Sequence, residues 1–600
     1  MSKEDSPHPV RDPGRAWSSG LAWPLAVAAL AYAAFTPALR GGFVSYDDVD
    51  LFVHNGGFRG LGARNLEWMF TTTRMGHYAP LTWLSHAVEF AGFGLDPAAF
   101  HRTNLLLHAL NAACVFLLAV RLLAAARPRE ASEHPLALKL AAAAAACLFA
   151  VHPLRAESVA WITERRGLLG SLFLLLALLA YLRACPRGSA AVSSRGAYAA
   201  SVLLLVLSLL SKGLGMAFVG MVVVLDFYPL RRIPAASAGW RSPAARPVWI
   251  QKIPFLLLGL VSAAISAWAA RSAAGTVLTL EQWGPLARAG QAAFGLAFYV
   301  RKTLHPLHLA AVVELPYRFD PTEPRFLASA LAVLLAIVLL AATRRRWPAL
   351  AAASAAYALA LAPVLGLLQA GPQLVADRYS YLACIPWALL AGGGLLAASA
   401  RCRPIATSAL FAAAGVAVIA LFRLSLAQAA TWVDTQTLWE HAIAAGEPSS
   451  VAYVNLGSLH AEAGDSDAAI ESYRAALRLR PDQGLAWFDL GIQYAARGRL
   501  EEAVQADREA CRTLKPAYKA LVNLGVHLDR LGRLDEALEP FRAAVADADA
   551  AGPELYSPVP HLVLGAALRR QGLDAEGRRH LQIAAASPET RAEALRELSR

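Results

Sequence analysis

Eleven apolar stretches, each about the length that a helix needs to cross a lipid bilayer, constrain this fold more than any other feature of the sequence. A chain of 600 residues with 56% hydrophobic and only 17% charged residues has the composition of a polytopic membrane protein. We therefore predict an all-α fold that begins with a polytopic transmembrane helical bundle over residues 21–430. The predicted spans are 21–39, 103–125, 137–154, 167–183, 197–211, 213–229, 252–270, 326–343, 348–367, 383–400 and 405–424.

The basic residues between these stretches predict the orientation of the chain. Arg231 with Arg232, and the run Arg344 to Arg346, fall on one side of the predicted membrane, which the positive-inside rule makes cytoplasmic. Residues 1–20 then form a cytoplasmic tail, and the carboxyl-terminal part lies on the opposite side. A further crossing by 286–304 would move Arg344 to Arg346 outside, so we interpret that segment as an interfacial or re-entrant helix. This distribution of charge also argues against nucleic acid as a partner.

After residue 430 a short pattern recurs every 34 residues. Glycine and alanine at fixed places let two antiparallel helices approach closely, and the spacing is that of tetratricopeptide repeats. We predict a tetratricopeptide-repeat α-solenoid over residues 431–600 with about four repeats, the last a degenerate unit around Gly565. Its concave face is expected to bind an extended peptide or a partner protein. The pattern consists of Gly457, Gly491 and Gly525 together with Ala469, Ala503 and Ala537.

Three aspartates follow the first predicted span. Asp47 and Asp48 lie about eight residues beyond it, where water reaches them, so a solvated loop explains them as well as a function does. The functional alternative is that one carboxylate takes a proton from an attacking hydroxyl while its neighbour holds it in place. Asp50 is then the solvated spare.

A second group of polar residues lies between the third and fourth predicted spans, in the sequence HPLRAESVAWITERRG. Pro153 breaks the helix there, and His152 by itself suits a hydrogen bond at a helix end better than catalysis. The group as a whole lies on the same predicted side as Asp47 and consists of His152, Arg155, Glu157, Glu164, Arg165 and Arg166. The candidate residues of a donor or acceptor pocket are His152, Arg155, Glu157 and Arg165, together with Tyr379.

Cationic residues on the same predicted side are candidates for binding a phosphate. Arg378, in VADRYSYL, has the planar fork that binds phosphate oxygens in pairs, and Tyr379 beside it suits the headgroup layer. An aromatic belt with a snorkelling arginine is the alternative. Arg301 offers the same choice, and Lys212, between two close spans, is either a turn anchor or another phosphate ligand.

Several common motifs are absent from the sequence. It contains no phosphate-binding glycine loop and no signature of the common hydrolases, and its six cysteines include no CxxC spacing. We expect no metal and no cofactor. Because nucleotides are absent outside the cytoplasm, a lipid-linked phosphate donor is the expected source of energy.

Taken in order, a set of motifs resembles the transmembrane and tetratricopeptide repeat-containing O-mannosyltransferases and their bacterial relatives. The motifs precede the repeats and are YDD (46–48), YAPLTWLSHAVEF (78–90), HRTNLLLHALNA (101–112), LFAVHPLRAESVAWITERRGLLG (148–170), LLSKG (209–213), LDFYPLRR (225–232) and ADRYSYL (376–382). The resemblance implies an inverting glycosyltransferase of the GT-C superfamily that uses a polyprenyl-phosphate-linked sugar.

The resemblance also implies roles for individual residues. Asp47 or Asp48 is the general base, Arg378 binds the donor phosphate, and Glu157 and His152 lie near the donor. The chain departs from its relatives at Gly167, where an acidic residue is expected, and at LSKGLG, where a proline or glutamate is more usual.

We therefore expect an integral membrane glycosyltransferase of the bacterial inner membrane. It would move a sugar from a polyprenyl-phosphate donor to a hydroxyl of an extracytoplasmic protein acceptor, while periplasmic repeats bind the acceptor or a partner. One alternative is a non-catalytic, membrane-anchored tetratricopeptide scaffold for envelope assembly. The other is a transferase that acts on a glycan or a lipid.

Overall fold

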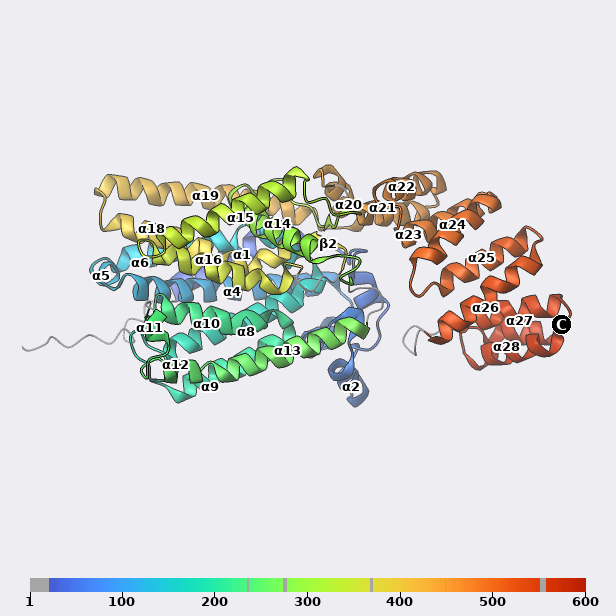
Figure 1. The fold of residues 1–600 in the computed structure, drawn as a ribbon, viewed down its shortest axis with the longest axis horizontal. Coiled ribbons are helices and arrows are strands. Elements are labelled where there is room, and N and C mark those ends of the chain that lie inside the picture. The colour runs from blue at the N-terminus through green and yellow to red at the C-terminus, as the bar shows by residue number, and fades with distance from the viewer. Residues whose placement is uncertain (1–20, 235–236, 273–277, 367–370, 448, 551–556) are drawn as a thin grey trace, which may run out of the picture.

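In the computed structural model the chain forms a long helical bundle with a curved array of helices at one end (Figure 1). The structure describes residues 21–600 apart from 235–236, 273–277, 367–370, 448 and 551–556, so the predicted tail at 1–20 lies outside the described residues. Among these residues the strands β1 (Val313–Glu314) and β2 (Gln373–Val375) form one small antiparallel sheet, and helices dominate the rest. The predicted all-α fold is confirmed.

All the predicted spans coincide with helices. Among the described residues, five helices are long and apolar enough to cross a membrane, or up to seven if each of two bent pairs is one span. With four shorter apolar helices, these account for the predicted stretches, and the chain is a multi-pass membrane protein. The helices are α1 (Ala22–Ala34), α4 (Pro97–Ala126), α6 (Pro135–Ala150), α8 (Arg165–Ala184), α9 (Arg195–Ser211), α10 (Phe218–Phe227), α13 (Ile253–Ser272), α15 (Pro324–Thr343), α16 (Pro348–Leu361), α18 (Ile385–Ser399) and α19 (Pro404–Ala430).

Two spans bend at the end of the bundle that faces the curved array, which we call the repeat end. Helix α6 stops at Ala150, and the chain turns by 57° into η5 (Pro153–Arg155) and α7 (Ala156–Ala160), as the helix-breaking Pro153 predicts. The segment Asp377–Ala383, which contains η9 (Asp377–Tyr379) and α17 (Ser380–Ala383), meets α18 at 47°. These bends leave short, polar segments between the spans at the repeat end.

The segment expected to be interfacial forms α14 (Pro285–Leu304), which packs against α15. It also contacts α16, where the Tyr357 hydroxyl donates a hydrogen bond of 2.6 Å to the Leu296 carbonyl. Helix α14 is not among the helices that are long and apolar enough to cross a membrane. Its interfacial or re-entrant position therefore stays a prediction.

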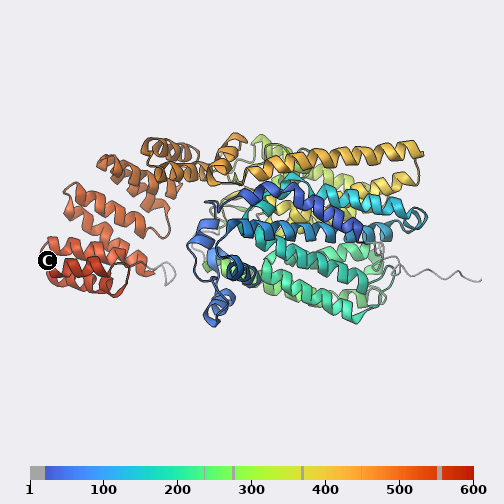
Figure 2. The same ribbon diagram turned by 180° about the vertical axis from the view of Figure 1, so that it is seen from behind.

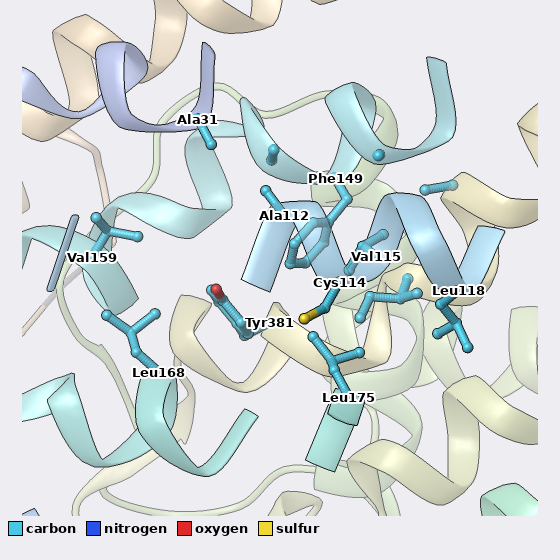
Figure 3. Close-up of a cluster of buried hydrophobic side chains, with 14 of the residues drawn as sticks. Ala31, Ala112, Cys114, Val115, Leu118, Phe149, Val159, Leu168, Leu175 and Tyr381 are labelled. Carbon is cyan, nitrogen blue, oxygen red and sulfur yellow. The ribbon is translucent and has the colours of Figure 1, made fainter. Parts of the chain in front are cut away.

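Small residues let the central helices of the bundle pack closely. A Cβ on Gly392 in α18 would lie 2.7 Å from the Ala141 carbonyl in α6, so only glycine fits there. Tyr381 of α17 points into the apolar core, where its ring meets that of Phe149 in α6 (Figure 3). Its hydroxyl lies 2.8 Å from His108 Nδ1 and accepts a hydrogen bond of 3.1 Å from Asn111 Nδ2, both in α4. These bonds hold α17 in a fixed position against the core.

The curved array consists of helix pairs, as the sequence predicts. A Cβ on Gly457 would lie 2.7 Å from the Tyr473 ring, which explains the glycine in the repeat. The predicted tetratricopeptide solenoid is confirmed. The pairs are α21 (Ser450–Glu462) with α22 (Ser466–Leu479), α23 (Gly484–Ala496) with α24 (Leu500–Thr513), α25 (Tyr518–Arg530) with α26 (Leu534–Ala550), and α27 (Val559–Arg570) with α28 (Asp574–Ala586), followed by α29 (Arg591–Ser599).

The array is joined directly to loops at the repeat end of the bundle (Figure 2). The Ser45 amide donates a hydrogen bond of 3.0 Å to Thr435 Oγ1 at the start of α20 (Thr435–Ala444). Glu314 of β1 accepts hydrogen bonds from the amide and the hydroxyl of Ser450 at 2.7 and 2.8 Å. Helix α20 therefore contacts the loop after α1, and the first repeat contacts the small sheet that precedes η9.

Candidate functional site

Asp48 ties the loop after α1 to the segment between α7 and α8. It is almost completely buried, and its Oδ2 accepts a hydrogen bond of 3.2 Å from the Val44 amide. Its Oδ1 accepts hydrogen bonds from the amide and the hydroxyl of Thr163, at 3.1 and 2.7 Å. Burial raises the pKa of Asp48 to about 7, although these hydrogen bonds favour the ionised form. Both oxygens are engaged, so Asp48 acts as a link between two loops.

Asp47 differs from its neighbour because its carboxylate has no hydrogen-bond or ion-pair partner among the described residues. The side chain is partly buried at the same end of the bundle. Burial raises the pKa of Asp47 to about 6, and the positive charges of Arg166 and Arg378 oppose that rise. A carboxylate with this pKa is ionised at neutral pH and basic enough to accept a proton.

Arg378 in η9 is buried and held by Glu157 of α7. Its backbone amide donates a hydrogen bond of 2.7 Å to Glu157 Oε2, and its Nη1 donates to Oε1. The guanidinium lies 5.4 Å from the centre of the Trp161 ring and 5.0 Å from that of Tyr379. These contacts fix the direction of the arginine in a largely dry environment.

Glu164 is the point on which three cations converge. Its buried carboxylate accepts hydrogen bonds of 3.0 and 2.7 Å from Lys212 Nζ. Nε of Arg166 lies 3.4 Å from Oε1, and Nε of Arg378 lies 3.8 Å from the same oxygen. Burial lowers the pKa of Lys212 to about 8, although Glu164 opposes that change.

A column of aromatic rings connects this charge cluster with the first helix after the bundle. Tyr46 stacks on Trp161 with ring centroids 4.7 Å apart and planes 15° apart. The same tyrosine ring meets the edge of Trp439 in α20 at 5.2 Å. Arg378, Trp161, Tyr46 and Trp439 therefore form one continuous series of contacts from the bundle to α20.

Three of the predicted site residues bind neighbouring segments of the chain. Arg155 donates to the carbonyl and hydroxyl of Ser380 at 2.9 and 2.6 Å, and Arg165 forms an ion pair of 2.5 Å with Glu89. His152 caps the turn after α6, because its Nδ1 accepts a hydrogen bond of 3.2 Å from the Leu154 amide. The expected helix-end role of His152 is thus observed.

The other predicted residues divide between the cluster and the surface. Lys212 and Glu157 belong to the cluster, and Tyr379 borders it through Arg378 and accepts a hydrogen bond of 2.8 Å from Gln373 Nε2. Arg301 is exposed in the last turn of α14 and lies over the Phe298 ring. No described contact joins Arg301 to the cluster.

From the sequence, Glu164 and Arg166 were placed in the polar group between the third and fourth predicted spans but were not predicted as site residues. His77 was not predicted at all. His77 and Arg166 line a pocket at the repeat end together with Arg74 and Thr163. The positive charges of Arg166 and Lys212 lower the pKa of His77. The one feature of the sequence that could have indicated His77 is its position directly before the motif at 78–90.

Comparison with known proteins gives two kinds of match. The tetratricopeptide repeat family matches residues 454–518 and 512–553. The human protein O-mannosyl-transferase TMTC1 is 31% identical over 239 residues, which are 37% of this chain and 25% of that protein. Protein O-mannosyl-transferase Tmtc1 of Drosophila melanogaster is 32% identical over 163 residues, 26% of this chain and 17% of that protein. The expected resemblance is confirmed.

The chain thus spans about a quarter or less of the length of these two relatives. Among solved structures, the crystal structure of MamA covers 26% of this chain and 90% of its own, with 19% identity and a TM-score of 0.24. These matches show that the chain resembles the O-mannosyl-transferases over part of its length and that it contains tetratricopeptide repeats.

Proposed function

We propose that this protein is an integral membrane glycosyltransferase that moves a sugar from a polyprenyl-phosphate donor to a hydroxyl of an extracytoplasmic protein acceptor. The observation that carries the proposal is one unpartnered carboxylate, Asp47, at the same end of the bundle as Lys212, Arg166 and Arg378. A proton acceptor and a group of cations are what such a transfer requires. Similarity to proteins named O-mannosyl-transferases supports the same reaction class.

Asp47 is the general base of the proposed reaction. The acceptor hydroxyl gives its proton to the Asp47 carboxylate, and its oxygen forms a bond to the anomeric carbon. The bond from that carbon to the phosphate oxygen breaks, and its electron pair leaves with the lipid phosphate. Because the attack comes from the face opposite the phosphate, the anomeric centre is inverted. Asp48 holds the loop that carries the base.

The cations stabilise the negative charge that develops on the leaving phosphate. Arg378 and Lys212 are the proposed donor ligands, with Arg166 as a further one, and this electrostatic contribution is usually the largest in such reactions. Arg301, which is exposed in the last turn of α14, is a further proposed ligand of the donor phosphate.

An apolar pocket in the bundle suits the isoprenoid part of the donor. It lies between α4, α8, α10, α16 and the α17–α18 segment, and Leu382 and Ile385 at its edge follow Arg378 in the chain. Aliphatic side chains gain from burying a hydrocarbon tail, while the phosphate is bound by cations nearby. The pocket thus supports a lipid-linked donor over a free sugar phosphate.

The repeats position the acceptor in this proposal. Asn455, Asp489 and Asn523 occupy the same register, two residues before each repeat glycine, and all three are partly exposed. The helices that carry them, α21, α23 and α25, contact one another in series. Regularly spaced amide and carboxylate groups can bind the backbone of an extended polypeptide, which raises its concentration at the site. The proposed location is the bacterial inner membrane, with the repeats on the periplasmic side.

Mass spectrometry of exported glycoproteins from cells that carry the wild-type chain, Asp47→Asn or Asp50→Asn tests this function. We expect Asp47→Asn to lower the hexose modification of exported proteins at least about 100-fold, while Asp50→Asn, which changes an exposed carboxylate, leaves it intact. Unchanged modification in correctly folded Asp47→Asn would favour a scaffold. Loss of hexose only from a glycan or lipid fraction would move the acceptor out of the protein class.

A further inference from the structure

Gly167 has no side chain, and the carboxylate of Glu164 occupies the space that such a side chain would fill. A Cβ built on Gly167 would lie 2.6 Å from Glu164 Oε2, well inside van der Waals contact. The same Cβ would lie 3.4 Å from Lys212 Nζ. Residues 164 and 167 therefore compete for one place beside Lys212.

The charges around this place require an anion. Lys212 Nζ, Arg166 Nε and Arg378 Nε approach a single carboxylate, and the three side chains are 17%, 13% and 8% exposed. Without a negative group between them, the three partly buried cations repel one another, and Lys212 and Arg166 bear the cost of burial without the carboxylate that pairs with them, while Arg378 keeps Glu157. Position 167 itself supplies no side chain here, so the anion comes from Glu164.

We propose that Glu164 is a positioning residue whose carboxylate fills the space beside Lys212 that a side chain at position 167 would otherwise occupy. Its carboxylate holds Lys212, Arg166 and Arg378 together so that they present one cationic surface to the phosphate of a lipid-linked donor. The inference rests on the proposed function for the identity of that phosphate. It assigns to Glu164 no proton transfer, because its two oxygens are engaged by cations, unlike those of Asp47.

The residues next to Glu164 and Lys212 hold both side chains in place. Thr163, the preceding residue, is held by Asp48, so the position of Glu164 depends on the loop that carries Asp47. On the other side, a Cβ on Gly170 would lie 3.4 Å from the Cβ of Lys212, so α8 passes close to the backbone of Lys212. Glu164 and Lys212 are thus fixed from both sides.

Because side chains at 164 and 167 would occupy the same space, we expect two single substitutions at these positions to be harmful alone but less harmful together. Glu164→Ala removes the anion, and Gly167→Asp alone adds a second carboxylate to an occupied site, so each single change should be harmful. Combined, Glu164→Ala with Gly167→Asp puts one carboxylate back beside Lys212. Glu164→Ala with Gly167→Ala is the matched control, because it restores bulk without charge.

The cycle is measured on the full chain in detergent with two readouts. The first is the affinity for a short-chain isoprenyl phosphate that carries no sugar, and the second is kcat and KM with the corresponding isoprenyl-phosphate mannose. We expect roughly 100-fold weaker phosphate binding in each single variant, recovery to within about tenfold in the charged double variant, and no recovery in the Ala–Ala control. KM should change more than kcat.

The outcomes separate this inference from the proposed function. Additive losses, or equal recovery by the Ala–Ala control, overturn the positioning role of Glu164. A wild-type chain that binds isoprenyl phosphate with the expected cycle but transfers no sugar overturns the glycosyltransferase and leaves the positioning role standing. If the single variants fail to fold, Glu164→Gln, which keeps the shape, must still weaken phosphate binding, and unchanged binding in that variant overturns the inference.

Discussion

The repeat end of the bundle and the solenoid both carry many charged side chains, but they use them in opposite ways. In the solenoid, Arg570 pairs with Asp529 at 2.7 Å while the two side chains are 52% and 24% exposed. At the repeat end of the bundle, Arg165 pairs with Glu89 while the side chains are 0% and 6% exposed. Water replaces a lost partner in the first case and cannot do so in the second.

This difference in burial indicates which charged residues are candidates for a functional role. A charge on the solenoid surface keeps the array soluble and tolerates change. A charge buried at the repeat end persists only because several groups meet it, so its position is defined by residues far apart in the sequence. Those defined positions are what a catalytic site needs.

Removing one partner of a buried pair should give the largest effect. Arg165→Met leaves Glu89 buried without its cation and removes the hydrogen bond of 3.0 Å to Asn104. We expect a loss of about 3–5 kcal/mol of stability, measured as denaturation of the full chain in detergent. Arg102→Met, which changes an exposed arginine of the same helix as Asn104, is the control. Equal stability of both variants would remove the contrast between the two regions.

The sequence predicted the regular parts of both regions well. The apolar stretches and the glycines 34 residues apart are periodic, and periodic patterns report burial and close approach directly. The bend at Pro153 also followed from local chemistry. Helix α3 (Pro80–Phe93) was not predicted as a helix, because its apolar stretch is short and contains polar residues that face other elements.

The site was only partly predictable because its contacts join distant segments. Asp47 and Asp48 are adjacent in sequence and identical in chemistry, yet only Asp48 is held by Thr163. Likewise Arg165 and Arg166 are adjacent, but the helical turn directs Arg165 to Glu89 and Arg166 to Glu164. No local pattern distinguishes the members of either pair, since the difference arises in tertiary packing.

A buried hydrogen bond between two polar side chains inside the solenoid offers a second test of the same contrast between buried and exposed groups. Asp507 takes the place held by Tyr473 and Phe541 in neighbouring repeats, and its Oδ2 lies 2.6 Å from His527 Nδ1. Asp507→Ala leaves this histidine buried without a partner, so we expect a loss of about 1–3 kcal/mol. Hydrogen exchange of the α24 and α25 amides in the full chain measures it.

Restoring the regular packing should reverse that loss. Asp507→Phe combined with His527→Leu puts an aromatic ring back against Gly491 and removes the histidine that needs a partner. We expect exchange in α24 and α25 to return to the wild-type rate or below it. A double variant no better than Asp507→Ala would mean that this repeat depends on the hydrogen bond between Asp507 and His527 for correct packing.

The pH dependence of transfer separates a titrating site from a solenoid surface that keeps its charges. Asp47 has a raised pKa of about 6 and works as a base only when ionised, so activity should fall about tenfold per unit below that pH. Lys212, with a lowered pKa of about 8, loses its charge above that value, and activity should fall again. The resulting bell-shaped profile of kcat/KM should keep an acidic limb in Asp47→Glu, because glutamate also titrates, but the midpoint of that limb should shift. A profile flat from pH 5 to 9, measured with folded protein, would contradict the assigned base.

The smallest loss of stability is expected from removing an exposed ion pair on the solenoid. Arg570→Ala removes an ion pair between α27 and α25 that has two short contacts, of 3.0 and 2.7 Å, and good geometry. Because both side chains remain accessible to water and salt screens them, we expect a loss of less than about 1 kcal/mol, and less still at high salt. Thermal unfolding of the full chain at low and high salt measures both quantities. A loss as large as that of Arg165→Met would show that geometry, and not burial, decides what a charge contributes in this protein.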